Sequence, residues 1–188
     1  SGYARLKVNQ ESGDRLVLNY AEQVNEDNSI NYNNMDNPAF YKRRLFQTDE
    51  FICCGREFLW TPKFTYHGFR YVLVEGLKEA TKSTLTAVFV HQDVELRSEF
   101  NCSNKLFNTL FEIGQRATLS NMFYGPTDCP TREKLGWMND AQSSIDQFMT
   151  NFELERVLSK WWVDICDAMK ENGELPGIVP THGWGYQW

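Results

Sequence analysis

The chain has 188 residues, of which 41% are hydrophobic and 23% charged, with a net charge of −6, so it is globular rather than intrinsically disordered. Its 19 lysines and arginines form no basic stripe, which argues against a nucleic-acid partner, and no apolar run reaches the roughly 20 residues that a membrane helix needs. Aromatic residues reach 14%, which fits either a large aromatic core or a sugar-binding cleft.

The first 95 residues are predicted to form an antiparallel β-sandwich, because they consist of short alternating runs of apolar and polar residues. The runs YARLKVN and DRLVLNYAE flank ESG and predict a hairpin. Further strands are predicted in FICCGREFLW, FRYVLVEGL and STLTAVFVHQ. The Asn-rich segment NEDNSINYNNMDNPAFYKRR, residues 25–44, predicts a long surface loop.

From residue 96 onward the apolar residues recur at helical spacing. A first helix is predicted in NCSNKLFNTLFEIGQRATLSNM, with Asn101 or Ser103 as its N-cap. A second is predicted in DAQSSIDQFMTNF, and a third in NFELERVLSKWWVDICDAMKENG, with Gly173 as its stop. Because strands come first and helices follow, the sequence predicts two domains, residues 1–95 and 96–188.

The third predicted helix carries a broad apolar face made by Leu158, Trp161, Trp162 and Ile165. Three helices offer too few partners to cover such a face, so we expect exposed apolar surface or self-association into a homo-oligomer through this face. The chain opens within a strand pattern and closes on the loop GWGYQW, which predicts a fragment of a longer protein.

The five cysteines and three histidines show no metal-binding spacing, since Cys-x-x-Cys is absent and the histidines lie far apart. The sequence therefore predicts neither a zinc site nor any other cofactor. Free thiols are expected, and they favour a cytoplasmic compartment over an oxidising one.

The stretch DCPTREKLGWMNDAQ, residues 128–142, holds Asp128, Glu133 and Asp140 in a segment too broken for one helix. Each acid has a structural alternative: Asp128 could cap a turn, Asp140 could cap the next helix, and Glu133 could pair with a neighbouring cation. The functional alternative is glycoside hydrolysis, which needs one carboxyl group as proton donor and a second that activates water or attacks the sugar. Spacing alone assigns no second catalytic carboxylate.

This stretch resembles the signature of the bacterial α-L-rhamnosidases, glycoside hydrolase family 78, in which an Asp-Cys-Pro-x-Arg-Glu run precedes Leu-Gly-Trp and Asp-Ala-Gln. Upstream, GYARLKV, LVLNYAE and TPKFTYHGFRYVLVEG are similar to the family's β-sandwich domain. Downstream, GELPGIVPTHGWGYQW is similar to a loop between early helices of its (α/α)6 barrel. The resemblance implies an N-terminally incomplete β-sandwich followed by the first helices of that barrel, an α+β chain in two parts.

The resemblance also implies an inverting hydrolase that removes terminal α-L-rhamnose from glycosides. Glu133 matches the general acid, and Asp128 and Asp140 match acids that bind the rhamnose hydroxyls. The other positions implied to line the sugar pocket are Arg132, Trp137 and, in the final loop, Trp184.

The family's general base is a glutamate near the far end of the barrel, which these 188 residues do not reach. The resemblance therefore implies that the chain alone is inactive, while its full-length parent hydrolyses rhamnosides. The alternative is a non-catalytic carbohydrate-binding or interaction module on a degenerate rhamnosidase scaffold. The intact acid cluster favours the hydrolase, because a binding module needs no general acid.

Overall fold

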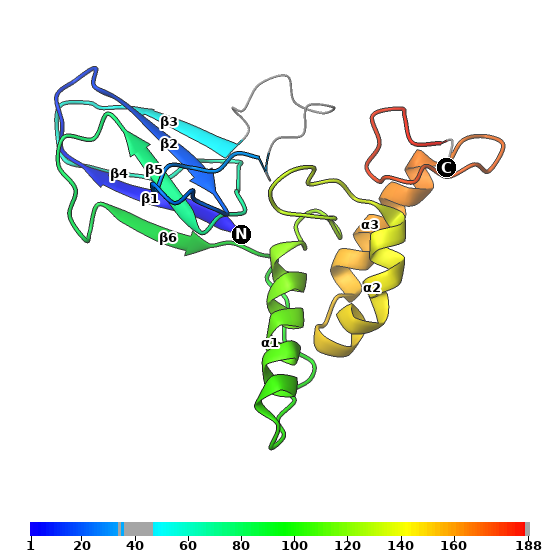
Figure 1. The fold of residues 1–188 in the computed structure, drawn as a ribbon. Coiled ribbons are helices and arrows are strands. Elements are labelled where there is room, and N and C mark those ends of the chain that lie inside the picture. Colours follow the sequence, from blue (N-terminus) through cyan, green and yellow to red (C-terminus); the bar gives the residue numbers. More distant parts are fainter. Residues whose placement is uncertain (34, 36–46, 187–188) are drawn as a thin grey trace. The chain divides into compact units, whose positions relative to one another are not determined.

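The computed structural model describes residues 1–33, 35 and 47–186 (Figure 1). Contacts divide the chain into two compact units. The first comprises Ser1–Val90 together with Pro130–Glu133, and the second comprises His91–Cys129 and the residues from Lys134 onward. The short segment Pro130–Glu133 thus belongs to the β unit although it follows a helix in sequence.

Within the described part of the first unit, six strands form two three-stranded sheets in which every pairing is antiparallel (Figure 1). The sequence prediction of an antiparallel β-sandwich is therefore confirmed. One sheet has the order β4-β1-β6 and the other β3-β2-β5. The strands are β1 (Gly2–Val8), β2 (Arg15–Ala21), β3 (Thr48–Ile52), β4 (Phe58–Trp60), β5 (Tyr71–Glu75) and β6 (Leu85–Phe89).

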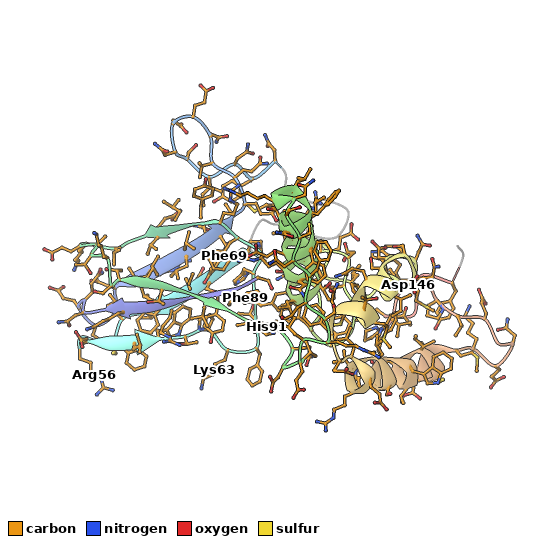
Figure 2. The ribbon with its side chains drawn as sticks, turned by 90° about the horizontal axis from the view of Figure 1, so that it is seen from below. Arg56, Lys63, Phe69, Phe89, His91 and Asp146 are labelled. Carbon is orange, nitrogen blue, oxygen red and sulfur yellow. The ribbon has the colours of Figure 1, made fainter. Side chains whose placement is uncertain are left out.

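The core of the first unit lies between the two sheets and is built by alternation along the two central strands. Successive side chains of a strand point to opposite faces, so every second residue of β1 is buried, while β2 is buried on both faces from Leu18 onward. The buried residues of this cluster are Ala4, Leu6 and Val8 of β1, Leu16, Leu18 and Tyr20 of β2, and Cys53. Charged side chains such as those of Arg56 and Lys63 point outward instead (Figure 2).

The predicted hairpin around ESG is wrong, because β1 and β2 lie in different sheets. The turn carries the chain across the sandwich, with Gly13 at a φ of 94°. Its N–H donates to the carbonyl oxygen of Cys53 at 2.9 Å, and the Cys53 N–H donates to the carbonyl oxygen of Asp14 at 2.8 Å. Alternation reveals a strand but not its partner, which is why the sequence pattern misled here.

The run FICCGREFLW was predicted as one strand and forms two, β3 and β4, which belong to opposite sheets. Between them the chain bends at Gly55, whose φ is 74°. Of the predicted loop over residues 25–44, the described part begins with a turn in which the Asn25 N–H donates to the carbonyl oxygen of Ser29 at 2.8 Å. Residues 34 and 36–44 of that prediction lie outside the described residues.

Three helices occur in the described part of the second unit, as the sequence predicted: α1 (Lys105–Ser120), α2 (Met138–Asn151) and α3 (Glu155–Ala168). The cap predictions are wrong in detail. Asn104 caps α1, its Oδ1 accepting from the Leu106 N–H at 3.0 Å. Helix α3 ends at Ala168, because Met169 is extended, and Gly173 lies in the following turn. None of the helices in the described ranges has the length and apolar character to cross a membrane.

The apolar face predicted on the third helix is only partly exposed. Trp161 and Ile165 are buried, Trp161 donating from Nε1 to the carbonyl oxygen of Val179 at 2.9 Å, whereas Trp162 is 64% exposed. The larger exposed apolar surface lies on α1. It comprises Leu106, Phe107, Leu110 and Ile113.

Candidate functional site

The acidic stretch at residues 128–142 is divided between the two units. Asp128 and Cys129 belong to the second unit, Pro130–Glu133 to the first, and the residues from Lys134 to the second again. The backbone is irregular, with Lys134 at a φ of 55°, an uncommon conformation for a non-glycine residue. Of the predicted site residues, Arg132 and Glu133 therefore belong to the first unit and the other four to the second.

In the second unit, Asp128 closes the loop that leads to Leu135. The Asp128 N–H donates to the Leu135 carbonyl oxygen at 3.0 Å, and the Leu135 N–H donates to Asp128 Oδ1 at 2.9 Å. One carboxylate oxygen therefore has a structural role, as a turn-capping acid would. The other, Oδ2, accepts no hydrogen bond within the described ranges and is available to a ligand.

Tyr124 lies beside this loop and donates its hydroxyl to the carbonyl oxygen of Lys134 at 3.0 Å. Burial and, second, the negative charge of Asp128 raise the pKa of Tyr124 to about 12. The phenol therefore stays protonated at neutral pH and holds the loop as a donor. No feature of the sequence pattern indicated this residue.

Trp137 and Asp140 line one cleft of about 570 Å3 at the start of α2. Trp184 reaches the same region, because its ring centroid lies 6.3 Å from that of Trp137 in an edge-to-face arrangement at 82°. The cleft is completed by Met138, Asn139, Gln142, Leu175, Pro176, Gly177 and Gly185. Asn139 and Gln142 were missed from the sequence, although a spacing of three residues places them on one side of a helix.

The carboxylate of Asp140 is not used as a helix cap. Trp137 occupies the N-cap position of α2 without a side-chain bond, and Asp140 stands in the first turn. Its carboxylate is exposed and accepts no hydrogen bond from the part of the chain that the structure describes. Asp140 lines the same cleft as Trp137. Its carboxylate is therefore suited to accept hydrogen bonds from the hydroxyls of a bound ligand.

Gly136 fixes the position of Trp137. It approaches the final loop so closely that a Cβ on it would lie 2.0 Å from the carbonyl oxygen of Val179. The Val179 N–H donates to the Gly136 carbonyl oxygen at 2.9 Å, and the Met138 N–H donates to that of Gly177 at 2.8 Å. These bonds pair the two segments on either side of Trp137 and hold its ring against the cleft.

In the first unit, Glu133 ends a segment that is fastened to the sandwich. The Gly68 N–H donates to the Pro130 carbonyl oxygen at 3.0 Å, and Thr131 Oγ1 donates to Glu22 Oε1 at 3.2 Å. Thr131 is buried, Arg132 exposed and Glu133 half-buried. The segment is thus anchored to the sandwich through Pro130 and Thr131, and Arg132 and Glu133 follow these anchors.

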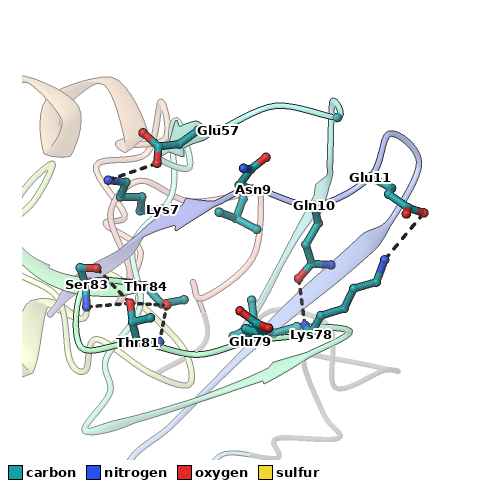
Figure 3. A pocket seen from close by; sticks show the side chains of 13 residues that line it. Lys7, Asn9, Gln10, Glu11, Glu57, Lys78, Glu79, Thr81, Ser83 and Thr84 are labelled. Carbon is teal, nitrogen blue, oxygen red and sulfur yellow. Dashed lines mark hydrogen bonds and ion pairs between the residues drawn. The ribbon is translucent and has the colours of Figure 1, made fainter.

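A second cleft, of about 660 Å3, lies in the β unit and contains none of the predicted site residues (Figure 3). Both lysines that line it are paired with acids: Lys7 Nζ lies 3.3 Å from Glu57 Oε2, and Lys78 Nζ lies 2.8 Å from Asp14 Oδ2 and 3.8 Å from Glu11 Oε2. No aromatic ring appears among its lining residues. Because both of its lysines are paired with acids and it has no aromatic lining, this cleft is not favoured as the site.

No group of three or more His, Cys, Asp or Glu side chains within residues 1–33, 35 and 47–186 is arranged to hold a metal ion. The five cysteines all lie in these ranges and form no disulfide with one another. The cleft beside Asp140 is lined by carboxylate, amide and aromatic side chains.

Two family models match the chain. Residues 1–91 match the bacterial alpha-L-rhamnosidase concanavalin-like domain, and residues 95–188 match the bacterial alpha-L-rhamnosidase 6 hairpin glycosidase domain. Among curated relatives, an alpha-L-rhamnosidase of Formosa agariphila is 30% identical over 98% of this chain and 20% of its own length. One of Streptomyces avermitilis is 31% identical over 97% of this chain and 17% of its own.

Solved structures agree with these matches. The alpha-L-rhamnosidase from Dictyoglumus thermophilum has a TM-score of 0.88 and 38% identity, covering 99% of this chain and 21% of that one. The Streptomyces avermitilis enzyme, solved in complex with L-rhamnose, has a TM-score of 0.86 and 31% identity over 97% of this chain and 17% of that one. The chain thus spans about a fifth of the length of the relatives it matches.

Proposed function

Because the chain belongs to the bacterial α-L-rhamnosidase family, we propose that it is part of an inverting glycoside hydrolase that removes terminal α-L-rhamnose from glycosides. The observation that supports this most is the cleft at the start of α2. There the carboxylate of Asp140 accepts no hydrogen bond from the described residues, and the edge-to-face pair of Trp137 and Trp184 provides apolar surface. A 6-deoxy sugar offers both hydroxyls for the carboxylate and an apolar face for the rings.

The proposed roles follow the chemistry of inversion. Glu133 donates its proton to the glycosidic oxygen as the bond to the anomeric carbon breaks, which releases the aglycone as an alcohol. A water molecule attacks the opposite face of the sugar and gives its proton to a general base. Asp128, through Oδ2, and Asp140 hold the rhamnose hydroxyls by charge-assisted hydrogen bonds. Arg132, Trp137 and Trp184 are assigned to the lining of the sugar pocket.

We assign the general base to a part of the enzyme beyond these 188 residues. The relatives are about five times longer than the segment they share with this chain, which leaves room for that base. Acid and base of an inverting enzyme stand roughly 6.5 to 9.5 Å apart with the water between them, so each must be placed independently. The 188-residue chain alone is therefore expected to release no rhamnose.

Product stereochemistry tests this proposal. The full-length gene product that carries this sequence is mixed with an α-L-rhamnoside, and the first-formed sugar is followed by proton NMR. An inverting hydrolase gives β-L-rhamnose first. Initial formation of α-L-rhamnose would contradict inversion, and binding of L-rhamnose by the full-length protein without any release from rhamnosides would favour the binding-module alternative.

A further inference from the structure

The segment that carries the proposed general acid is held by the β unit rather than by the helices that flank it in sequence. Pro130–Glu133 belong to the first unit, whereas Cys129 and Lys134 belong to the second. The anchors are the Gly68 N–H, which donates to the Pro130 carbonyl oxygen at 3.0 Å, and Glu22, whose Oε1 accepts from Thr131 Oγ1 at 3.2 Å. Thr131 is 2% exposed and Glu22 half-buried, so this second contact is partly buried.

Gly68 is itself fixed by a buried hydrogen-bonded chain that begins in the sandwich core. Gln47, which is buried, donates from Nε2 to the Gly68 carbonyl oxygen at 2.9 Å. Its Oε1 lies 3.0 Å from Nδ1 of His67, and Nε2 of that ring lies 3.1 Å from Asp49 Oδ2. Asp49 Oδ2 also accepts from the Tyr20 hydroxyl at 2.7 Å, and the Tyr20 and His67 rings stack at 4.0 Å.

The carbonyl oxygen of Gly68, at one end of this hydrogen-bonded series, determines which groups in the series donate and which accept. Since a carbonyl oxygen only accepts, Gln47 must turn its amide nitrogen toward Gly68 and its oxygen toward His67. His67 Nδ1 must then be a donor. The backbone on either side is fixed as well, because His67 exchanges two hydrogen bonds with Gly2, at 2.8 and 2.6 Å. A side chain that turned away would leave a buried polar group without its partner.

Packing at Gly68 is equally restrictive. A Cβ built on Gly68 would lie 2.8 Å from Cγ2 of Thr131 and 3.0 Å from Cγ of Pro130. The segment therefore fits against the sandwich only because residue 68 has no side chain. An added methyl group would displace the segment without changing the chemistry of any carboxyl group.

We propose that Gln47, Gly68 and Thr131 are positioning residues, which place the carboxyl group of Glu133 for proton transfer to the leaving group. The inference rests on the proposed function, because only a general acid needs this precision. Proton donation requires hydrogen-bond reach to the glycosidic oxygen, and a misplacement of about 1 Å can cost roughly 100-fold in rate. The β-sandwich is then a part of the catalytic apparatus and not only a neighbouring domain.

The test uses the full-length enzyme with Gly68→Ala, Thr131→Val and Thr131→Ser. Each is assayed on an alkyl rhamnoside, whose leaving group needs protonation, and on a nitrophenyl rhamnoside, whose leaving group needs little. We expect Gly68→Ala to lower kcat on the alkyl substrate by about 10- to 100-fold and Thr131→Val by about 10-fold. Losses on the nitrophenyl substrate should be several times smaller, KM should change little, and Thr131→Ser should retain activity.

Two control variants make the same chemical changes away from the segment. Thr86→Val alters an exposed threonine of β6, and Gly114→Ala adds a methyl group that meets only Gln147 Nε2 at 3.6 Å. Both should keep normal rates on both substrates. If Gly68→Ala fails to fold, as judged by circular dichroism, Thr131→Val and Thr131→Ser decide the question.

Equal losses on the two substrates, or no loss, would overturn the inference. Glu133→Gln measured in parallel separates this outcome from failure of the proposed function. If Glu133→Gln shows the leaving-group dependence and the Thr131 and Gly68 variants do not, the positioning role is wrong and the general acid stands. If Glu133→Gln shows none, the assigned acid itself is wrong.

Discussion

At the scale of single residues, two aspartates of the same stretch have different surroundings. Asp128 uses Oδ1 to close the loop to Leu135, so it combines a structural bond with an available second oxygen. Asp140 stands exposed in the first turn of α2 and lines the cleft. The sequence left capping and ligand binding open for both, and only the hydrogen bonds separate them.

Asp140→Asn should therefore affect binding without affecting folding. A hydrogen bond to a charged group is worth about 1.5 to 3 kcal/mol, so KM for alkyl and nitrophenyl rhamnosides should rise by about 10- to 100-fold in the full-length enzyme. The factor should be similar for both substrates, since the sugar is the same. Asp146→Asn, a matched change at an exposed position of α2, is the control (Figure 2). A change confined to one substrate would contradict the role.

Tyr124 makes the stability of the folded chain fall as the pH rises above about 10. Its pKa in the folded chain is about 12, raised above the ordinary 10 by burial and by Asp128, so folding disfavours the ionised phenol. Its contribution to stability is present below about pH 10 and is lost as the pH rises toward 12. Denaturant unfolding across this range should show a steeper loss in the wild type than in Tyr124→Phe. Equal slopes would contradict this assignment.

At the scale of elements, the sequence pattern predicts where the strands and helices lie. It does not predict which strands pair or which helix faces become buried. Alternation located β1 and β2, but their membership in opposite sheets follows from pairing with strands distant in sequence, β1 with β4 and β6 and β2 with β3 and β5. Helical spacing placed Trp161 and Trp162 on one apolar face, yet one is buried under the final loop and the other exposed. The family signature indicated Glu133, whereas the hydrogen bond from Gly68 to Pro130, at the start of the segment that carries Glu133, appears only in the fold.

The close approach of Gly136 to Val179 should be sensitive to any added side chain. Gly136→Ala places a methyl group against the carbonyl oxygen of Val179, which breaks the pairing that holds Trp137. We expect a loss of about 1 to 3 kcal/mol in the free energy of unfolding, with weakened rhamnose binding. Chemical denaturation and calorimetric titration of the full-length protein measure the two effects. Gly114→Ala is the control, and unchanged stability in Gly136→Ala would show that the loop relaxes.

At the scale of the whole molecule, the exposed apolar face of α1 bears on association. Leu106, Phe107, Leu110 and Ile113 lie on one helix and are each more than half exposed. Such a patch is usually covered by other protein. We expect the 188-residue chain to self-associate or bind a hydrophobic dye, and Leu110→Lys to reduce both. Leu59→Lys, at an exposed leucine of β4, is the control. A clean monomer by light scattering without dye binding would contradict this expectation.

The most direct test of the whole account is the rate of Glu133→Gln in the full-length enzyme on substrates with poor and good leaving groups. General acid catalysis typically contributes about 100- to 10,000-fold, so kcat on an alkyl rhamnoside should fall by at least that lower factor. The fall on a nitrophenyl rhamnoside should be much smaller, and Glu26→Gln, an exposed glutamate of the same unit, should leave both rates unchanged. Near-normal turnover of the alkyl rhamnoside by Glu133→Gln would contradict the assignment of the general acid.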